Sequence, residues 1–331
     1  MDNVTHTLMG IALSRAGLNR LTPHATWITV LASNVPDLDI IANAGGGLLY
    51  LDLHRGPTHG LPLTPLLAVL PVLAVKLFAK TPVPFFPAWI VALVPLLAHL
   101  AMDYFTTYGT RLLSPFSERW FQLPLFYILD AWILGVLLLA LAAPALSKLV
   151  GGEIGARATA TPGRGWAIFA LTMIVLFGLA RFTIRQRALT MLESRVYHGE
   201  APKQIEVQPH IINPLRWRGL IRGSNFVSIH EFNVALDFDP DHGLTLWQPE
   251  KSPSWQAARR SGTMSRFLRF AQWPVFRIIP LDEPSGAQRI TVDDVRFGYP
   301  SSTFHAEVDV DVNNRVIDER FTMGGSNSRK R

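Results

Sequence analysis

The segment 54–59 has the residue types of a metal or anion site. It holds two histidines, an arginine and a threonine around the pair Gly56-Pro57. That pair is typical of a turn, because glycine tolerates unusual backbone angles and proline fixes its own. The turn can fold His54 and His59 toward each other and leave Arg55 free to contact an anion. A surface loop that happens to contain two histidines is the alternative.

Two pairs of candidate ligands flank this segment in the sequence. His99 and Asp103 are four residues apart, so on a helix they share one face, where the carboxylate can bind the same cation as the imidazole or orient the ring. Asp37 and Asp39 are two apart and therefore point to different sides of a helix or a strand. They can serve different metals, or one can be a ligand and the other its support. A cap for the next helix is the alternative.

Two further candidates stand alone. His6 lies one turn into an apolar N-terminal segment, where a packed core histidine is the alternative. Asp130 lies near the start of a long apolar run and is either a helix N-cap or part of the site.

The absence of cysteine restricts any metal site to histidine, aspartate and glutamate. A divalent metal is the expected cofactor, with zinc first and manganese or iron as alternatives. Such ions lower the pKa of bound water and clamp a phosphoryl or carbonyl oxygen, and a nearby arginine with hydroxyls favours a phosphate. The predicted metal ligands are His6, Asp37, Asp39, His54, His59, His99 and Asp103. The predicted catalytic residues are Arg55, Thr58 and Asp130.

The composition indicates a membrane protein. Of the 331 residues, 49% are hydrophobic and 17% are charged, whereas about 25% are charged in a typical soluble domain. Two short apolar segments, 3–18 and 24–43, come first and are expected to form short or re-entrant helices. The net charge of +6 is scattered beside the apolar runs, so it predicts contacts with anionic lipid and not with nucleic acid. Four clear runs have about the length that crosses a bilayer: 61–79, 86–103, 126–147 and 164–184.

The last third of the chain has a different pattern. Period-two alternation of apolar and polar residues, bounded by glycine, proline and aspartate, predicts half-exposed antiparallel strands. It occurs at 226–237, 275–279, 290–297 and 303–310. We therefore predict three regions: an α-helical integral membrane bundle over 1–187, a β-rich soluble domain over 188–323 and a disordered basic tail over 324–331.

Four spans would bring the candidate residues and the β-rich domain to one side of the membrane. Arginines are numerous on that side, and the positive-inside rule then leans slightly toward the cytoplasm. Several of these arginines can instead serve the site or the β-rich domain, so the orientation stays open.

As an ordered set, the motifs resemble a known family. They are Thr5-His6 to Gly10, Asn34 to Asp39, His54 to His59, His99 to Asp103, 106–117 and Asp130. This set is similar to the YdjM-type inner-membrane proteins, which are labelled predicted membrane-bound metal-dependent hydrolases. The resemblance implies a multi-pass protein of a bacterial-type inner membrane. A more distant similarity is to zinc-dependent phospholipase C and single-strand-specific nucleases, whose processed N-terminus is a metal ligand, a feature not expected here.

The leading hypothesis is a metal-dependent hydrolase of a phosphoester, of the lipid or polyprenyl phosphate type, that works through a metal-activated water. Membrane lipids and the lipid-like phosphoester are the expected partners. The chain has no signature of serine hydrolases, P-loop enzymes, zincins or dinucleotide-binding folds. One alternative is a non-enzymatic membrane protein with a structural metal site and a partner-binding β domain. A small-solute transporter is a less favoured alternative. A carrier is expected to have polar groups across the bilayer, and the runs 61–79, 126–147 and 164–184 carry no central charge.

Overall fold

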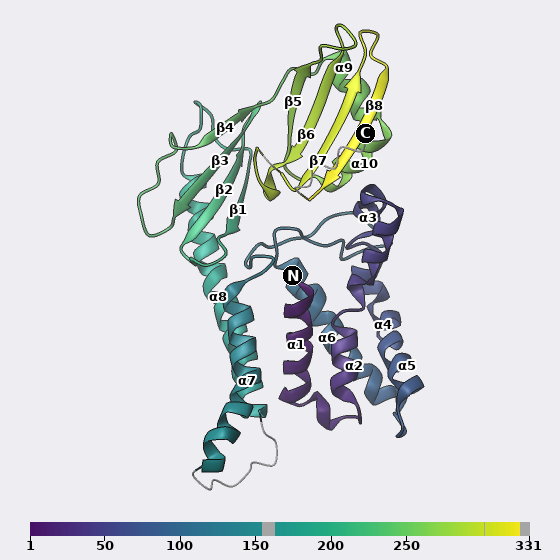
Figure 1. The fold of residues 1–331 in the computed structure, drawn as a ribbon. Helices are drawn as coiled ribbons and strands as arrows, with labels where there is room; N and C mark the ends of the chain where they lie inside the picture. Colours follow the sequence, from purple (N-terminus) through teal and green to yellow (C-terminus); the bar gives the residue numbers. More distant parts are fainter. Residues whose placement is uncertain (154–162, 301, 325–331) are drawn as a thin grey trace.

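The computed structural model describes residues 1–153, 163–300 and 302–324. Its first eight helices form one half of the molecule and its strands form the other, drawn below and above in Figure 1. The helical half contains α1 (Asn3–Ala16), α2 (Ala25–Ala32), α3 (Gly47–Leu53), α4 (Thr64–Leu67), α5 (Val69–Phe78), α6 (Phe85–Tyr104), α7 (Ala131–Glu153) and α8 (Arg164–Glu193). Short 3-10 helices connect them: η1 (Leu18–Arg20), η2 (Pro36–Gly45), η3 (Pro57–His59) and η4 (Leu61–Leu63).

Three helical segments are long and apolar enough to cross a membrane: Leu61–Phe78, Phe85–Tyr104 and Arg164–Glu193. The fourth predicted span, 126–147, is not confirmed, since the described apolar stretch of α7, Ala131–Leu146, is shorter. α7 begins after Asp130, which follows a turn at residues 128–129. Three of the four predicted spans therefore have counterparts among the described residues, and the fourth stays a prediction.

α1 and α2 are the short N-terminal helices that the sequence predicts. Asp2 caps α1 by accepting a hydrogen bond from the Thr5 backbone N–H at 3.0 Å. Gly10 allows α1 to approach α2 closely, because a Cβ at this position would clash with Ser33 Oγ. The second apolar segment divides at Pro36, where the chain enters η2, since proline has no N–H to continue an α-helix.

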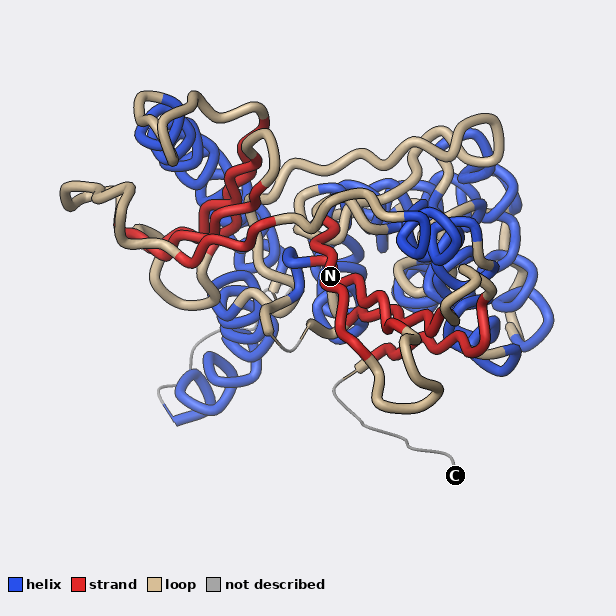
Figure 2. The backbone as a smooth tube through the Cα atoms, turned by 90° about the horizontal axis from the view of Figure 1, so that it is seen from above, coloured by secondary structure: helices blue, strands red, loops and turns tan. Residues whose placement is uncertain are grey.

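Two antiparallel four-stranded sheets confirm the predicted β-rich region. The first has the order β1 (Gln204–Pro209), β2 (Arg216–Arg222), β3 (Phe226–Asn233), β4 (Leu244–Trp247). The second has the order β5 (Pro274–Pro280), β6 (Gln288–Asp294), β7 (Phe304–Val310), β8 (Val316–Met323). Seen from above, the two sheets occupy separate areas of the molecule (Figure 2). The sequence predicted β3, β5, β6 and β7 and missed the other four strands.

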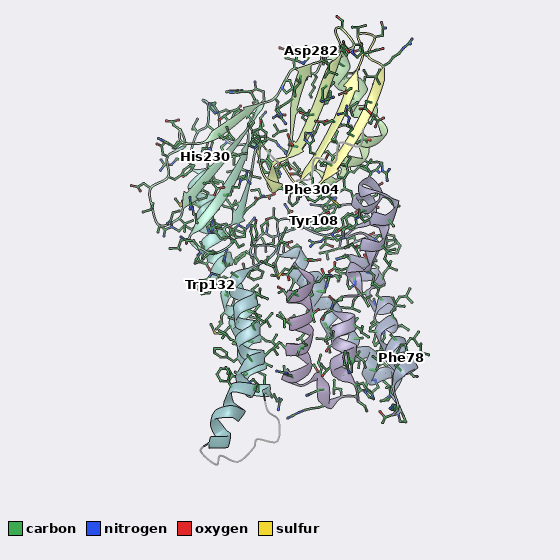
Figure 3. The ribbon with its side chains drawn as sticks, viewed as in Figure 1. Phe78, Tyr108, Trp132, His230, Asp282 and Phe304 are labelled. Atoms are coloured by element: carbon green, nitrogen blue, oxygen red, sulfur yellow. The ribbon has the colours of Figure 1, made fainter. Side chains whose placement is uncertain are left out.

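The second sheet has a helical layer that the sequence analysis did not predict. α9 (Pro253–Arg260) contributes Trp255 and Ala258, and α10 (Gly262–Phe270) contributes Phe267 and Phe270, to a core with apolar residues of β6 and β7. Tyr108 of the helical half inserts into the same core, with its ring centroid 5.9 Å from that of Phe304. Figure 3 labels this pair at the junction of the two halves.

The loop between α6 and α7 holds both sheets in place. The buried Arg296, which follows β6, donates hydrogen bonds to the carbonyl oxygens of Thr107 at 3.1 Å and Phe270 at 3.3 Å. Glu206 of β1 accepts one from Gln122 Nε2 at 2.7 Å. Both sheets are thereby joined to the loop that directly follows the candidate residues of α6.

One helix crosses the predicted boundary between the membrane and soluble domains. α8 continues beyond residue 187 to Glu193 and packs Ala188 and Leu192 in one core with Trp217 of β2. The predicted domain limits remain a prediction, but the first sheet is built directly on a candidate span. The predicted disordered tail lies, after Gly324, outside the described residues.

Candidate metal centre

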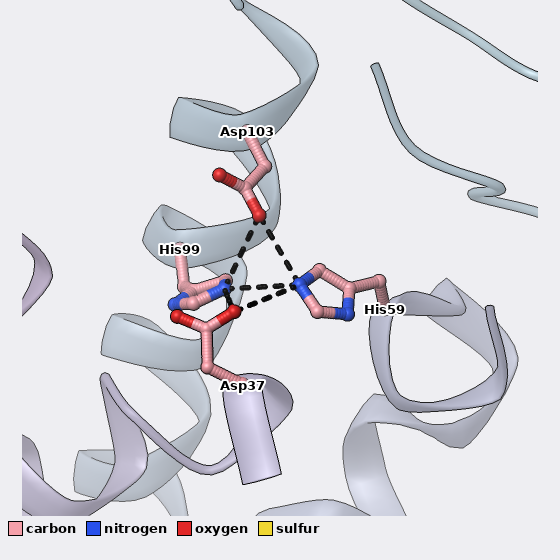
Figure 4. A group of neighbouring side chains, drawn as sticks. All are labelled: Asp37, His59, His99 and Asp103. Carbon is pink, nitrogen blue, oxygen red and sulfur yellow. Dashed lines mark hydrogen bonds and ion pairs between the residues drawn. The ribbon is translucent and has the colours of Figure 1, made fainter. Parts of the chain in front are cut away.

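Four predicted ligands meet at one point near the upper end of the helices (Figure 4). They are Asp37 from η2, His59 from η3, and His99 and Asp103 from α6. One ligand atom of each lies within 4.8 Å of the others. The side chains of His59, His99 and Asp103 are 0% exposed, and Asp37 is nearly buried. The four-residue spacing on α6 thus places both of its candidates in one site, as the sequence predicts.

The distances fit a small cation. Asp103 Oδ2 lies 3.1 Å from His59 Nε2 and 3.3 Å from His99 Nε2. Asp37 Oδ1 lies 3.6 Å from His59 Nε2 and 3.7 Å from His99 Nε2. A tetrahedral ion with bonds of about 2.0–2.2 Å holds its ligand atoms about 3.3–3.6 Å apart. Two imidazoles and two carboxylates are also a donor set that divalent zinc accepts.

Neighbouring groups fix the orientation of both imidazole rings. His99 Nδ1 lies 2.7 Å from the carbonyl oxygen of Ser33; because a carbonyl only accepts, Nδ1 carries the proton and Nε2 presents its lone pair to the centre. His59 Nδ1 contacts Thr58 Oγ1 at 3.1 Å and Asp39 Oδ2 at 3.5 Å. The two Nε2 atoms are 3.2 Å apart, a distance that requires a proton or a metal ion between them.

The electrostatics favour positive charge at this point. Burial opposes a charge on His59, but the carboxylates of Asp103 and Asp37 outweigh it and raise the pKa of His59. Burial alone would raise the pKa of Asp37, yet the hydrogen bond from His59 and the nearby His99 hold it well below its usual range. The two carboxylates therefore favour a positive charge at the centre.

Asp39 points away from Asp37, as the spacing predicts, and supports the segment 54–59. It accepts hydrogen bonds from the Arg55 backbone N–H at 3.0 Å, Thr58 Oγ1 at 3.0 Å and His54 Nδ1 at 2.8 Å. Arg55 has a φ of 54°, a backbone conformation that costs energy for a residue other than glycine. One carboxylate thus holds the turn that presents His59. The predicted residues Asp39, His54 and Thr58 lie beside the four-ligand group and not within it.

Arg55 is not free, which corrects the sequence-based expectation. Its guanidinium donates to Asp103 Oδ1 at 2.9 Å, to the Gly109 carbonyl oxygen at 3.0 Å and to Thr106 Oγ1 at 3.3 Å. It also lies 4.5 Å from the ring centroid of Tyr108. Arg55 therefore neutralises the oxygen of Asp103 that faces away from the centre, and it positions this ligand.

His6 lies against the centre without joining the four ligands. Its ring stacks on His99 with the centroids 3.7 Å apart, and its Nε2 lies 3.5 Å from Asp103 Oδ1. Burial lowers the pKa of His6 to about 3, so the ring is neutral at pH 7. The amino group of Met1, which the sequence analysis did not expect at the site, contacts the same oxygen of Asp103.

Asp130 lies at the start of α7 and caps it. Its carboxylate accepts hydrogen bonds from the backbone N–H groups of Trp132 at 3.1 Å and Ile133 at 3.3 Å. It also lies 3.7 Å from Arg181 of α8. Within the described ranges Asp130 forms no hydrogen bond or ion pair with the four ligands, so its geometry is that of the N-cap alternative.

A cavity of about 660 Å³ adjoins the centre, between the helices and the two sheets. Asp37, His54 and Arg55 line its wall next to the ligand group, and Arg218 and Glu231 of the first sheet line another wall. Tyr50, which the sequence analysis did not consider, also lines it and stacks on His54 with the centroids 4.5 Å apart. The centre is therefore reached from a space that both halves of the molecule enclose.

A bundle with three candidate spans and a buried histidine–aspartate group defines a membrane protein with a possible metal site. Comparison with known proteins gives the family. A family model described as YdjM inner membrane protein matches residues 1–188, and the chain belongs to this family. It is also similar to the uncharacterized protein YfhP of Bacillus subtilis (strain 168), with 34% identity over 298 residues, which are 84% of this chain and 81% of that protein. No solved structure matches.

Proposed function

We propose that the chain is a metal-dependent hydrolase of a membrane-associated phosphoester. The observation that supports this most is the convergence of Asp37, His59, His99 and Asp103 beside a cavity of about 660 Å³. Three arginines, Arg55, Arg218 and Arg296, line that cavity. Arg55 and Arg296 are held by protein partners, so they would contribute positive charge to the wall, which suits a phosphate.

The four ligands would hold one divalent ion, zinc first. Such an ion supplies a Lewis acid for a phosphoryl oxygen and lowers the pKa of a water. The chain's own residues prepare the site. The carbonyl oxygen of Ser33 and the carboxylate of Asp39 keep the two imidazoles oriented. Arg55 balances the outer oxygen of Asp103, so that the other oxygen remains available to a cation.

The second candidate function is a structural metal site in a non-enzymatic protein. The complete burial of His59, His99 and Asp103 favours it, because structural metal sites are closed whereas catalytic sites keep a position open to substrate. In that case the two sheets would bind a partner. Only Asp37 of the four ligands lines the cavity, so access to the ion would pass its carboxylate.

The test is hydrolysis by the purified full-length protein in detergent. A panel of a chromogenic phosphodiester, a phosphatidic acid and a polyprenyl phosphate is offered to protein loaded with zinc or manganese and to protein treated with a chelator. We expect turnover that needs the metal, that is lost in His59→Ala and that is retained in His242→Ala, since His242 is an exposed residue of the β-rich half. Full metal occupancy without turnover, combined with unfolding on chelation, would support the structural site instead.

A further inference from the structure

The 3-10 helix η2 presents three different faces. In this helix there are three residues per turn, so side chains at i and i+3 lie above one another. Asp37 and Ile40 share the face toward the metal centre and the cavity, and both line the cavity. Asp39 lies on a second face, toward the segment 54–59. Leu38 and Ile41 share the third face, where they are 53% and 71% exposed.

The exposed residues of the cavity wall mark its mouth. His54, Arg55 and Tyr108 are buried and form the inner end. The exposed lining residues from the helical half include Ile40, which is 60% exposed, and Tyr127. The exposed lining residues from the sheet half are Glu231 and Thr303. The mouth is therefore lateral, at the level where the helices end and the sheets begin.

Large apolar side chains are exposed next to lining residues of the helical half. Leu38 and Ile41 flank the lining residues of η2, Val4 follows Asn3, and Leu129 follows Ile128. The candidate span α6 ends at Tyr104, directly after the ligand Asp103. Exposed apolar side chains of this kind are typical of membrane or partner contacts.

We propose that the cavity opens sideways into the bilayer and admits an amphiphile with its anionic head first. The head group would reach the wall formed by Asp37, His54 and Arg55, while its hydrocarbon chain passes Ile40 and extends into the lipid. Leu38 and Ile41 then lie among the acyl chains at the rim. The identification of the head group as a phosphoester rests on the proposed function; the lateral opening to lipid does not.

The absence of cysteine allows a direct test of the opening. Single substitutions Leu38→Cys and Ile41→Cys are spin-labelled in the full-length protein in phosphatidylcholine vesicles. Collision with oxygen, which concentrates in lipid, is compared with collision with chromium oxalate, which stays in water. Val312→Cys and Leu236→Cys in the sheet half are matched controls, because these apolar residues are comparably exposed. We expect a several-fold higher oxygen preference at 38 and 41, and equal preference at all four sites would overturn the opening.

A second measurement tests the amphiphile. A spin label at Ile40→Cys should lose mobility when hexadecyl phosphate is added and keep it when inorganic phosphate is added. An unchanged spectrum with both would overturn the route past Ile40. Neither measurement needs turnover. If both succeed while no phosphoester is hydrolysed, the proposed function fails and the lateral opening stands.

Discussion

Two regions of the molecule place histidine beside carboxylates, and they do so in opposite ways. In the candidate metal centre, four possible ligand atoms from η2, η3 and α6 point at one buried position. On one face of the second sheet, charges instead alternate in a row, which we term the charge ladder. Its members are Arg277, Arg289, Asp293, His305, Glu307, Asp309 and Arg320.

Every residue of the charge ladder has an oppositely charged partner in the protein. His305 donates through Nδ1 to Asp293 at 2.7 Å and through Nε2 to Glu307 at 2.9 Å. Arg289 donates two parallel hydrogen bonds to Asp309, at 2.7 and 2.8 Å. The cause is the strand register, in which Arg289 pairs with Asp309 and Asp293 with His305, so that opposite charges face each other across the sheet.

The metal centre lacks that pairing. His59 and His99 direct Nε2 toward each other and toward Asp37 and Asp103, and proton donors are too few to satisfy all of these atoms. The number of histidines and carboxylates is therefore a poor guide to a metal site. What separates the two regions is whether the lone pairs converge on one point or are each satisfied by a neighbour.

The largest effect should be on metal content. Mass spectrometry of the purified protein, prepared without chelators, should find near one zinc or manganese per chain in the wild type. His59→Ala and His99→Ala should reduce this to below about a tenth. Each substitution removes one of the four ligands, so the ion is bound much less tightly. His305→Ala removes a histidine with two carboxylate partners from the charge ladder and should keep full occupancy. Equal loss in all three variants would remove the distinction between the regions.

A smaller effect on metal affinity is expected from Asp39, which supports the ligand His59 but is not one of the four ligands. Asp39→Asn keeps the shape of a side chain that holds His54, Thr58 and the Arg55 backbone but weakens its contact with His59. Loss of such a supporting partner typically costs about 10–100-fold in metal affinity. Competition with a fluorescent chelator measures that affinity, and Asp309→Asn in the charge ladder is the control. If Asp39→Asn leaves the metal affinity unchanged, the segment 54–59 keeps its conformation without the charge of Asp39.

The sequence predicts the ligand group better than it predicts the roles within it. The spacing of His99 and Asp103, and the opposite directions of Asp37 and Asp39, follow from helix geometry alone and agree with the structure. Which aspartate faces the centre depends on how η2 packs against the segment 54–59, and that contact between distant segments leaves no local pattern. For the same reason, the pairing of Arg55 with Asp103 could not be foreseen.

The β-rich half shows a similar limit. β8 was missed because its exposed polar residues, such as Asp318, Glu319 and Arg320, conceal the alternation that a strand with a buried face displays. In α10 the signal was present: Met264, Phe267 and Phe270 recur every three residues and are all buried. The surrounding arginines obscured it. Pairing partners and covering helices decide these elements, and a single stretch of sequence contains neither.

The smallest effect should be a pH-dependent stability of the charge ladder. Burial alone would lower the pKa of His305, but the hydrogen bonds to Asp293 and Glu307 raise it to about 9, above the value of about 6.5 for an unfolded histidine. The protonated form is thus the one that stabilises the fold. This contribution is fully present below about pH 6.5 and is lost as the pH rises through about 9. Because the site is partly exposed and screened, we expect about 1–2 kcal/mol.

His305→Gln should therefore lower the thermal midpoint in detergent at pH 6, and the difference from wild type should shrink above pH 9. His242→Gln removes a histidine that contacts Asp239 on the open surface, at 2.7 Å but largely exposed, and should leave the midpoint unchanged because exposed pairs contribute little. A constant difference for His305→Gln from pH 6 to pH 10 would show that the histidine stabilises by packing. The ion pairs of His305 would then contribute no measurable stability. The two regions would differ only in whether their ligand atoms point at one position.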